Sequence, residues 1–331
     1  SNLCSEITLP TGVDKDGRDR TAVCCLSSLN IEKYDEWKND KNFIGDVMRF
    51  LDNVLTDFIE KAPEEFSDAT YSAMKERSVG LGVMGLHSFF QQKMIPLESV
   101  MSKVWNKKIF EHIQKEVDKA SQNLAEERGA CPDAADYGIK ERFSNKTAIA
   151  PTASISIICG GTSPGVEPIA ANSFTHKTLS GSFNVRNRYL EKILEKHNKN
   201  DDETWSTITT NQGSVSHLDF LTQQEKDVFK TAFELDQKWI VELGADRTPH
   251  ISQAQSINIF VPADIHKKEL HQIHFQAWKK GLKSLYYCRS KSIQRAENVN
   301  DSKLTDVMAN VYKSKNQQNE EKEYEECLSC Q

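Results

Sequence analysis

The chain lacks the long hydrophobic run of 18 or more residues that a membrane-spanning helix requires. It also lacks a charged segment followed by an apolar one near its first residue, so no secretory signal is predicted and a cytoplasmic location is expected. Acidic residues outnumber basic ones, 48 against 42, and the formal net charge of −6 argues against a nucleic-acid-binding surface. Neither a membrane nor a nucleic acid is therefore expected among its partners.

A dense cysteine framework is also missing, because eight cysteines are scattered over 331 residues. Free thiols in a reducing compartment are expected. Only Cys24-Cys25 and Cys327-x-x-Cys330 are local pairs. No histidine accompanies the second pair at zinc-site spacing, so a redox dithiol is favoured over half of a zinc site and no metal site is predicted. A thiol-rich, zinc-binding module without enzymatic activity remains the alternative.

Hydrophobic periodicity alternates between helices and strands. Helical spacing predicts helices over 42–61, from Pro96 to about Gly129, over 222–243 with a capping box at Thr222, and over 263–280. Short apolar runs predict strands over 5–9, 21–26, 147–158, 256–261 and 283–289. This order predicts an α/β fold with a largely parallel sheet. Residues 1–295 form the expected folded domain, and the polar residues 296–331 are expected to be a flexible tail.

The first six residues, Ser-Asn-Leu-Cys-Ser-Glu, carry an amide, a thiol and a carboxylate at alternate positions. In an extended segment Asn2, Cys4 and Glu6 would point to the same side and converge. They would supply a hydrogen-bonding group, a nucleophile or one-electron carrier, and a proton acceptor. The alternative is an exposed N-terminal arm with an incidental cysteine.

Three further stretches are candidates for chemistry. Residues 151–156, Pro-Thr-Ala-Ser-Ile-Ser, could present backbone N–H groups to a phosphate, or form an ordinary capped turn. The tyrosines of Tyr286-Tyr287 would point to opposite faces of a strand, but could stack as a one-electron relay if the strand ends there. A hairpin-like return of the chain would bring Cys24 towards Cys4.

These motifs together are similar to those of one enzyme family. They are Ser-Asn-Leu-Cys-Ser-Glu (1–6), Cys-Cys-Leu-Ser-Ser-Leu-Asn (24–30), Gly-Leu-Gly-Val-Met-Gly (80–85), Ala-Pro-Thr-Ala-Ser-Ile-Ser (150–156), Asn-Gln-Gly-Ser-Val (211–215), Gln-Ala-Gln-Ser-Ile-Asn (253–258), Leu-Tyr-Tyr (285–287) and the terminal Cys-x-x-Cys. The chain resembles the catalytic, or large, subunit of class I ribonucleoside-diphosphate reductases. These enzymes reduce ribonucleoside diphosphates to 2′-deoxyribonucleoside diphosphates for DNA synthesis. Cobalamin-dependent and glycyl-radical reductases share the barrel and the loop cysteine, but the tyrosine pair favours class I.

The resemblance implies a role for each candidate residue. Cys4 would carry the thiyl radical that abstracts the ribose 3′ hydrogen, Glu6 would be the general base on the 3′ hydroxyl, and Asn2 would orient the ribose hydroxyls. Substrate contacts are implied for Ser1, Asn2, Leu3, Cys4, Ser5 and Glu6, and for the diphosphate loop Thr152, Ala153, Ser154, Ile155 and Ser156.

The resemblance also implies the electron-transfer groups. Tyr286 and Tyr287 would be the last steps of the radical path. Cys24 stands where the family keeps one of two reducing cysteines, and Cys25 stands where the family more often has Thr, so Cys24 is the expected reducing cysteine and Cys25 is the alternative. Cys327 and Cys330 would be the tail dithiol that re-reduces the site and is itself reduced by thioredoxin or glutaredoxin.

The fold implied is the C-terminal half of a ten-stranded α/β barrel that begins at the loop carrying Cys4. Its partners would be the N-terminal half of the same subunit and a metal-containing small subunit that supplies the radical. No cofactor is expected on this chain, and ATP or dNTP effectors would bind regions outside it. The start at Ser1 suggests a split gene or an intein junction. We also expect the loop around Cys4 to depend on a chain that is not included here.

Overall fold

The computed structural model describes residues 1–178 and 181–290. The tail predicted over 296–331, with Cys327 and Cys330, lies outside these residues. The described strands are β1 Gly12–Val13, β2 Asp19–Arg20, β3 Cys25–Asn30, β4 Val79–Met84, β5 Ser173–Thr178, β6 Gly181–Arg186, β7 Ile259–Val261 and β8 Cys288–Ser290.

Helices connect most of these strands. The α-helices are α1 Tyr34–Trp37, α2 Phe43–Lys61, α3 Ser67–Glu76, α4 Leu86–Gln92, α5 Val100–Arg128, α6 Pro132–Ala135, α7 Ala153–Ile158, α8 Arg188–Lys196, α9 Asp202–Thr210, α10 Gln223–Val228, α11 Gln237–Arg247 and α12 Lys267–Lys279. The 3₁₀ helices are η1 Ile31–Lys33, η2 Glu64–Phe66 and η3 Thr248–His250.

Parallel pairing runs through the centre of the molecule. β3 pairs with β4, and β7 pairs with β8, both in parallel. Parallel bridges join Leu81 to Thr147 and Ile149 to Gln255, so the segment 147–149 lies between β4 and the stretch that leads into β7. The predicted α/β fold with a parallel sheet is confirmed. The expected strand over 147–158 is shorter, because the chain turns into α7 at Ala153.

Two glycines of β4 permit this close packing. A Cβ atom on Gly82 would lie 2.4 Å from the carbonyl oxygen of Ala148, and one on Gly80 would lie 2.4 Å from Leu26 Cδ2. Any larger residue would therefore force the neighbouring strands apart.

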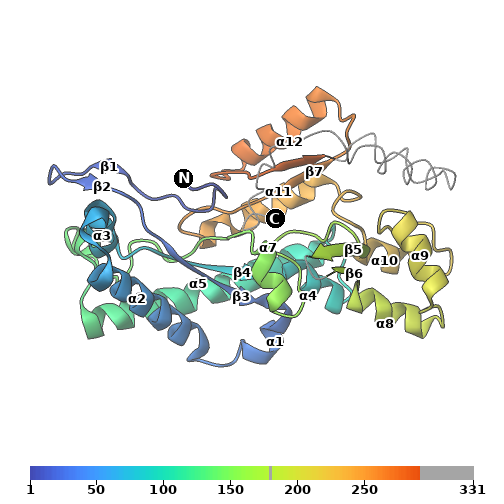
Figure 1. Ribbon diagram of the computed structural model, residues 1–331, viewed down its shortest axis with the longest axis horizontal. Helices are drawn as coiled ribbons and strands as arrows, with labels where there is room; N and C mark the ends of the chain where they lie inside the picture. The colour runs from blue at the N-terminus through green and yellow to red at the C-terminus, as the bar shows by residue number, and fades with distance from the viewer. Residues whose placement is uncertain (179–180, 291–331) are drawn as a thin grey trace, which may run out of the picture.

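Long helices cover the sheet. The apolar faces of α2 and α5 pack with β3 and β4 around Met48, Leu55, Val83 and Ile113, in the largest of the hydrophobic clusters described (Figure 1). α8 to α10 form a second cluster around Trp205 and Phe229. A third joins α11, α12 and β7. The helices predicted over 42–61 and after Pro96 are confirmed as α2 and α5.

Some local predictions are wrong. The strand expected over 21–26 begins only at Cys25, and the strand expected over 283–289 begins only at Cys288. Residues 5–9 form no strand, and the chain instead makes its return through the short antiparallel hairpin β1–β2. The helix predicted over 222–243 is two helices, because α10 ends at Val228 and a new N-cap at Asp236 opens α11. The capping box at Thr222 is present as predicted.

The hairpin is fixed to the helices by buried charges. Arg20 pairs with Asp14 at 2.9 Å and donates to both carboxylate oxygens of Asp133, at the start of α6. The Tyr71 hydroxyl of α3 donates to Asp14 at 2.9 Å. These contacts set where the chain re-enters the sheet at Cys24.

Candidate active site

The first residues form a turn rather than the expected extended segment. The Ser5 N–H donates to the Asn2 carbonyl at 3.2 Å, and Ser5 has a left-handed φ of 65°. Side chains along a turn do not alternate between two faces, so the convergence expected from spacing alone does not apply. Cys4 is partly buried within this turn, whereas Leu3 is exposed.

The turn rests on two segments from the other end of the chain. The Ser5 hydroxyl donates to the Leu285 carbonyl at 3.2 Å, and the Ser284 hydroxyl donates to the Ser5 carbonyl at 2.9 Å. The Ala254 N–H donates to the Glu6 carbonyl at 2.9 Å. The loop is therefore held by contacts with residues of this chain, and the expected dependence of its chemistry on a further chain stays a prediction.

The Cys4 thiol points at the tyrosine pair. It donates to the hydroxyl of Tyr286, with 3.4 Å between Sγ and Oη. The ring of Tyr286 stacks on that of Tyr287, with centroids 4.0 Å apart and an interplanar angle of 32°. Both tyrosines precede β8, which begins at Cys288, so strand alternation does not separate them. The result is a continuous line of contacts from a 42% exposed ring, that of Tyr287, to the thiol.

The carboxylate of Glu6 is fixed and buried beside this line. Its side chain is only 2% exposed, and Oε2 accepts from the Ser256 hydroxyl at 3.1 Å. The same hydroxyl also donates to the Cys4 carbonyl. Asn2 uses its side-chain carbonyl to accept from the Ile7 N–H at 3.0 Å, a bond that does not involve its amide nitrogen.

Cys24 and Cys25 occupy different surroundings. The Cys24 sulfur accepts from the side-chain amide of Gln253 at 3.2 Å. Burial raises the pKa of the Cys24 thiol to about 12, and the Gln253 hydrogen bond opposes that rise. Cys25, the first residue of β3, packs against the core around α2 and α5 instead, and burial raises its pKa as well.

The candidate phosphate loop begins just after the segment 147–149. Thr152 adopts a left-handed conformation and its hydroxyl accepts from the Gly165 N–H at 2.7 Å. Ser156 is buried and donates to the Ala153 carbonyl at 3.1 Å, whereas Ser154 and Ile155 are exposed. Because the first N–H groups of a helix lack intrahelical acceptors, those of α7 are available to an anion.

Sequence reasoning did not assign roles to Gln253, Ser256, Asn258 and Glu167. The Asn258 side chain accepts from the Tyr287 N–H at 2.9 Å and donates to the buried carboxylate of Glu167 at 2.6 Å. The usable signal was the polar motif over 253–258 within an otherwise apolar strand region, where polar side chains need a partner.

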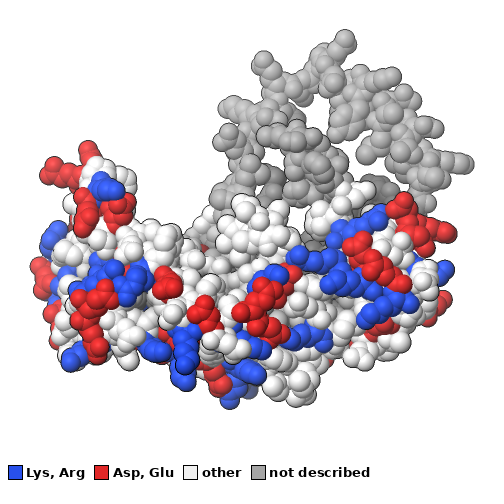
Figure 2. All heavy atoms as spheres, turned by 90° about the horizontal axis from the view of Figure 1, so that it is seen from below, with Lys and Arg blue, Asp and Glu red and all other residues white. Residues whose placement is uncertain are grey.

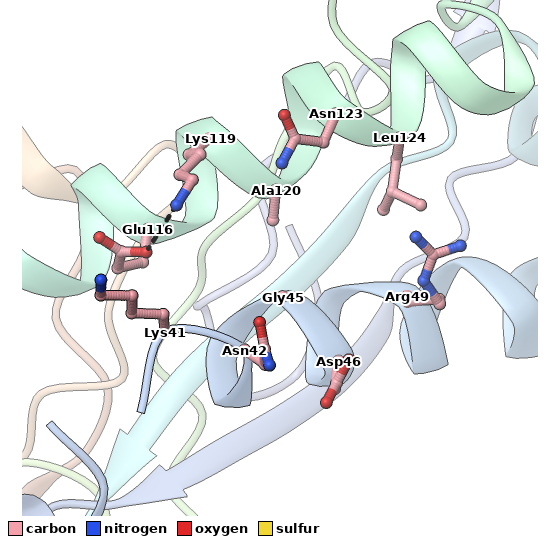
Figure 3. A pocket seen from close by; sticks show the side chains of 10 residues that line it. All are labelled: Lys41, Asn42, Gly45, Asp46, Arg49, Glu116, Lys119, Ala120, Asn123 and Leu124. Atoms are coloured by element: carbon pink, nitrogen blue, oxygen red, sulfur yellow. Dashed lines mark ion pairs between the residues drawn. The ribbon is translucent and has the colours of Figure 1, made fainter. Parts of the chain in front are cut away.

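The other surface features of the described residues do not point to a second site. A pocket between α2 and α5 is lined by side chains of both charge signs, and Lys119 pairs with Glu116 within it (Figure 3). Arg49 at its edge pairs with Glu127. On the face seen in Figure 2, basic and acidic residues are interspersed in small groups. Over residues 1–178 and 181–290 no group of three or more metal-ligating side chains occurs. None of the described helices is both long and apolar enough to cross a membrane.

Comparison with known proteins decides the family. Residues 1–138 and 133–288 match the family model described as ribonucleotide reductase, barrel domain. The chain belongs to the ribonucleotide reductase barrel family. The resemblance drawn from the motifs is confirmed, and so is the expected α/β barrel fold for the part that this chain contains.

Relatives support the same family. The chain is 52% identical over 305 residues to the ribonucleoside-diphosphate reductase large subunit of Invertebrate iridescent virus 6, covering 91% of this chain and 31% of that protein. It is 45% identical to the large subunit of Invertebrate iridescent virus 3, covering 92% and 48%. The class Id ribonucleotide reductase alpha subunit of Actinobacillus ureae superposes with a TM-score of 0.80 at 38% identity, covering 88% of this chain and 53% of that one. The chain thus spans about half or less of the length of these relatives.

Proposed function

We propose that this chain carries the catalytic loop of a ribonucleoside-diphosphate reductase, which replaces the ribose 2′ hydroxyl by hydrogen through radical chemistry. The observation that carries the proposal is the contact of the Cys4 sulfur with Tyr286, together with the stack of Tyr286 on Tyr287. This geometry suits the transfer of an electron and a proton between a phenol and a thiol, because each group touches the next.

The side chains of the loop carry out different steps of the reaction. A thiyl radical on Cys4 takes the 3′ hydrogen atom of the ribose, and Glu6 takes the proton of the 3′ hydroxyl as a general base. Acid–base help of this kind is typically worth ~10²–10⁴ in rate. The 2′ hydroxyl leaves as water after gaining a proton from a thiol. Two electrons from a dithiol complete the reduction, and Cys4 then returns the hydrogen atom to C3′.

The electrons enter through cysteines. We assign Cys24 rather than Cys25 as the reducing thiol, because Cys24 meets a polar partner whereas Cys25 packs into the core. The disulfide left after each turnover is reduced by Cys327 and Cys330, which exchange in turn with thioredoxin or glutaredoxin.

Substrate and partners follow from the same assignment. Asn2 orients the ribose, and residues 152–156 bind the diphosphate at the start of α7. The remaining part of the large subunit closes the barrel and binds ATP or dNTP effectors, and a small subunit supplies the radical from its metal centre. The partial coverage of the relatives supports the need for the first of these partners.

The test is turnover by the complete enzyme containing this chain. Cys4→Ser should abolish deoxynucleotide formation and leave substrate affinity nearly unchanged, because serine is almost isosteric but cannot carry a thiyl radical. Cys159→Ser, which changes an exposed cysteine of α7's C-cap, is the matched control and should retain activity. Substantial product from the Cys4→Ser enzyme would refute the assignment.

A second variant tests the tail. Cys330→Ser should permit one turnover by the pre-reduced enzyme and block further turnovers when thioredoxin is the sole reductant. Sustained turnover under those conditions would show that another group carries the electrons.

A further inference from the structure

The side chain of Gln253 joins three separate parts of the site. It is only 1% exposed. Its amide nitrogen donates to the Cys24 sulfur and to the Val79 carbonyl, each at 3.2 Å. Its carbonyl oxygen accepts from the Thr8 N–H at 3.1 Å. One buried amide therefore links the starts of β3 and β4 to the segment that follows the Cys4 loop.

The sulfur of Cys24 has a specific place beside this amide. A Cβ atom on Gly80 would lie 3.2 Å from it, so the absence of a side chain at Gly80 opens the space that the sulfur fills. The ionisable groups that face the thiol are Cys25, Glu6 and Glu76, and all of them disfavour its negative charge, as does burial. The hydrogen bond from Gln253 acts in the opposite direction.

We propose that Gln253 is a positioning residue for Cys24: its amide holds the sulfur beside the Cys4 loop and donates the hydrogen bond that stabilises the thiolate. The carbonyl end of the same side chain fixes the segment after Glu6 through the Thr8 N–H, so the reducing thiol and the catalytic loop keep one relative position. The role of Cys24 in turnover comes from the proposed function, whereas the positioning of its sulfur by Gln253 does not depend on that function.

The hydrogen bond from Gln253 affects the reduction of a disulfide at Cys24, because the Cys24 thiolate is the leaving group of that reaction. When an external dithiol reduces a disulfide at Cys24, its thiolate attacks the other sulfur, the S–S bond breaks and Cys24 leaves as a thiolate. The second thiol of the dithiol then resolves the mixed disulfide, becoming oxidised while the site cysteines are reduced. The Cys24 thiolate later takes a proton from solvent. A donor on Cys24 favours the first step because a better-stabilised thiolate leaves faster.

The test uses alkylation of this chain by iodoacetamide, read by mass spectrometry. Cys24 and Cys25 fall in one tryptic peptide between Arg20 and Lys33, and fragment ions separate them. Cys25 is the internal reference for local opening of β3. Gln253→Met removes all three hydrogen bonds, whereas Gln253→Glu keeps an acceptor for the Thr8 N–H and removes the donor at the alkaline pH where the thiol ionises.

The expected result is a lower ratio of Cys24 to Cys25 alkylation in both variants. A hydrogen bond to a charged acceptor corresponds to about one pKa unit or more, and so to a roughly tenfold smaller thiolate fraction. The higher nucleophilicity of a more basic thiolate offsets part of this, which leaves a net decrease of about threefold.

The matched control is Gln237→Met. Gln237 is a buried amide with the same three-bond pattern, since it donates to two backbone carbonyls and accepts from the Phe260 N–H, but it does not touch Cys24. Its variant should leave the ratio unchanged. An unchanged or higher ratio in Gln253→Glu would overturn the proposal, and so would rates that rise together at both cysteines. The alkylation ratio does not depend on nucleotide reduction. It therefore tests the role of Gln253 separately from the proposed function, which is tested by turnover of the Cys4→Ser enzyme.

Discussion

The buried carboxylate of Glu167 should make folding stability depend on pH in an unusual direction. Its side chain is 8% exposed. Burial raises its pKa from 4.5 to about 7, although the hydrogen bond from Asn258 and the nearby charge of Arg289 oppose the rise. Because Asn258 also binds the Tyr287 backbone, this carboxyl group lies close to the tyrosine stack.

The sign and size follow from proton binding. Between about pH 4.5 and 7 the folded chain holds the Glu167 proton and the unfolded chain does not, so its contribution to stability falls as pH rises and levels off above 7. A difference of two to three pKa units corresponds to about 3 kcal/mol. Glu167→Gln keeps the acceptor for Asn258 and removes the titration. The variant should match the wild type near pH 4.5 and exceed it by up to about 3 kcal/mol at pH 8.

Urea unfolding of both proteins at a series of pH values between 5 and 8 measures the difference. Glu65→Gln, which removes an exposed carboxylate from η2, is the charge-matched control. A gain that is the same at every pH, or a loss that grows with pH, would refute the burial argument. The quantity compared is the free energy of unfolding of the variant minus that of the wild type at the same pH. Carboxylates that titrate in the same way in both proteins contribute nothing to this difference.

Other positions give predictions of a different kind. Asp52→Ala should destabilise the chain by about 3–5 kcal/mol in urea unfolding, because it leaves the guanidinium groups paired with this fully buried carboxylate without a counter-charge. Gly80→Ala should cost about 1–3 kcal/mol and displace the Cys24 sulfur, which alkylation would report as a changed rate at that cysteine alone. Ser256→Ala should lower kcat of the complete enzyme about tenfold or more, with unfolding free energy changing far less, since the hydroxyl orients Glu6; unchanged kcat would show that Glu6 needs no such support.

Local sequence pattern predicted the parts of the fold that local physics controls. The apolar spacing that predicts α2 and α5 lies entirely within those helices, and the capping box at Thr222 lies within four consecutive residues. The break between α10 and α11 was not predicted from the apolar spacing, which suggested one helix, whereas Asp236 caps the start of a new helix. The family motifs identified the candidate side chains, but not the turn that carries Cys4.

That turn is decided by contacts with residues some 250 to 280 positions away. Ser256, Ser284 and Leu285 are too far along the chain to enter any local pattern around Cys4. The alternation of residues 2, 4 and 6 alone therefore predicted an extended segment. Partners so distant also carry a large loop-closure entropy, which the packed sheet must offset before the turn is ordered.

The arrangement separates folding from chemistry within the site. Cys4 and Glu6 lie on a loop whose order derives from the segments 253–256 and 284–287. Substitutions of the reactive groups themselves should therefore leave the sheet intact, whereas substitutions in the segment 253–256 should alter the orientation of both the loop and Cys24. Gln253 and Ser256 lie three residues apart in one motif, and they contact Cys24, the proposed reducing thiol, and Glu6, the proposed general base, respectively. A single segment thus sets the relative position of the groups proposed for hydrogen-atom abstraction, on the Cys4 loop, and for electron delivery, at Cys24.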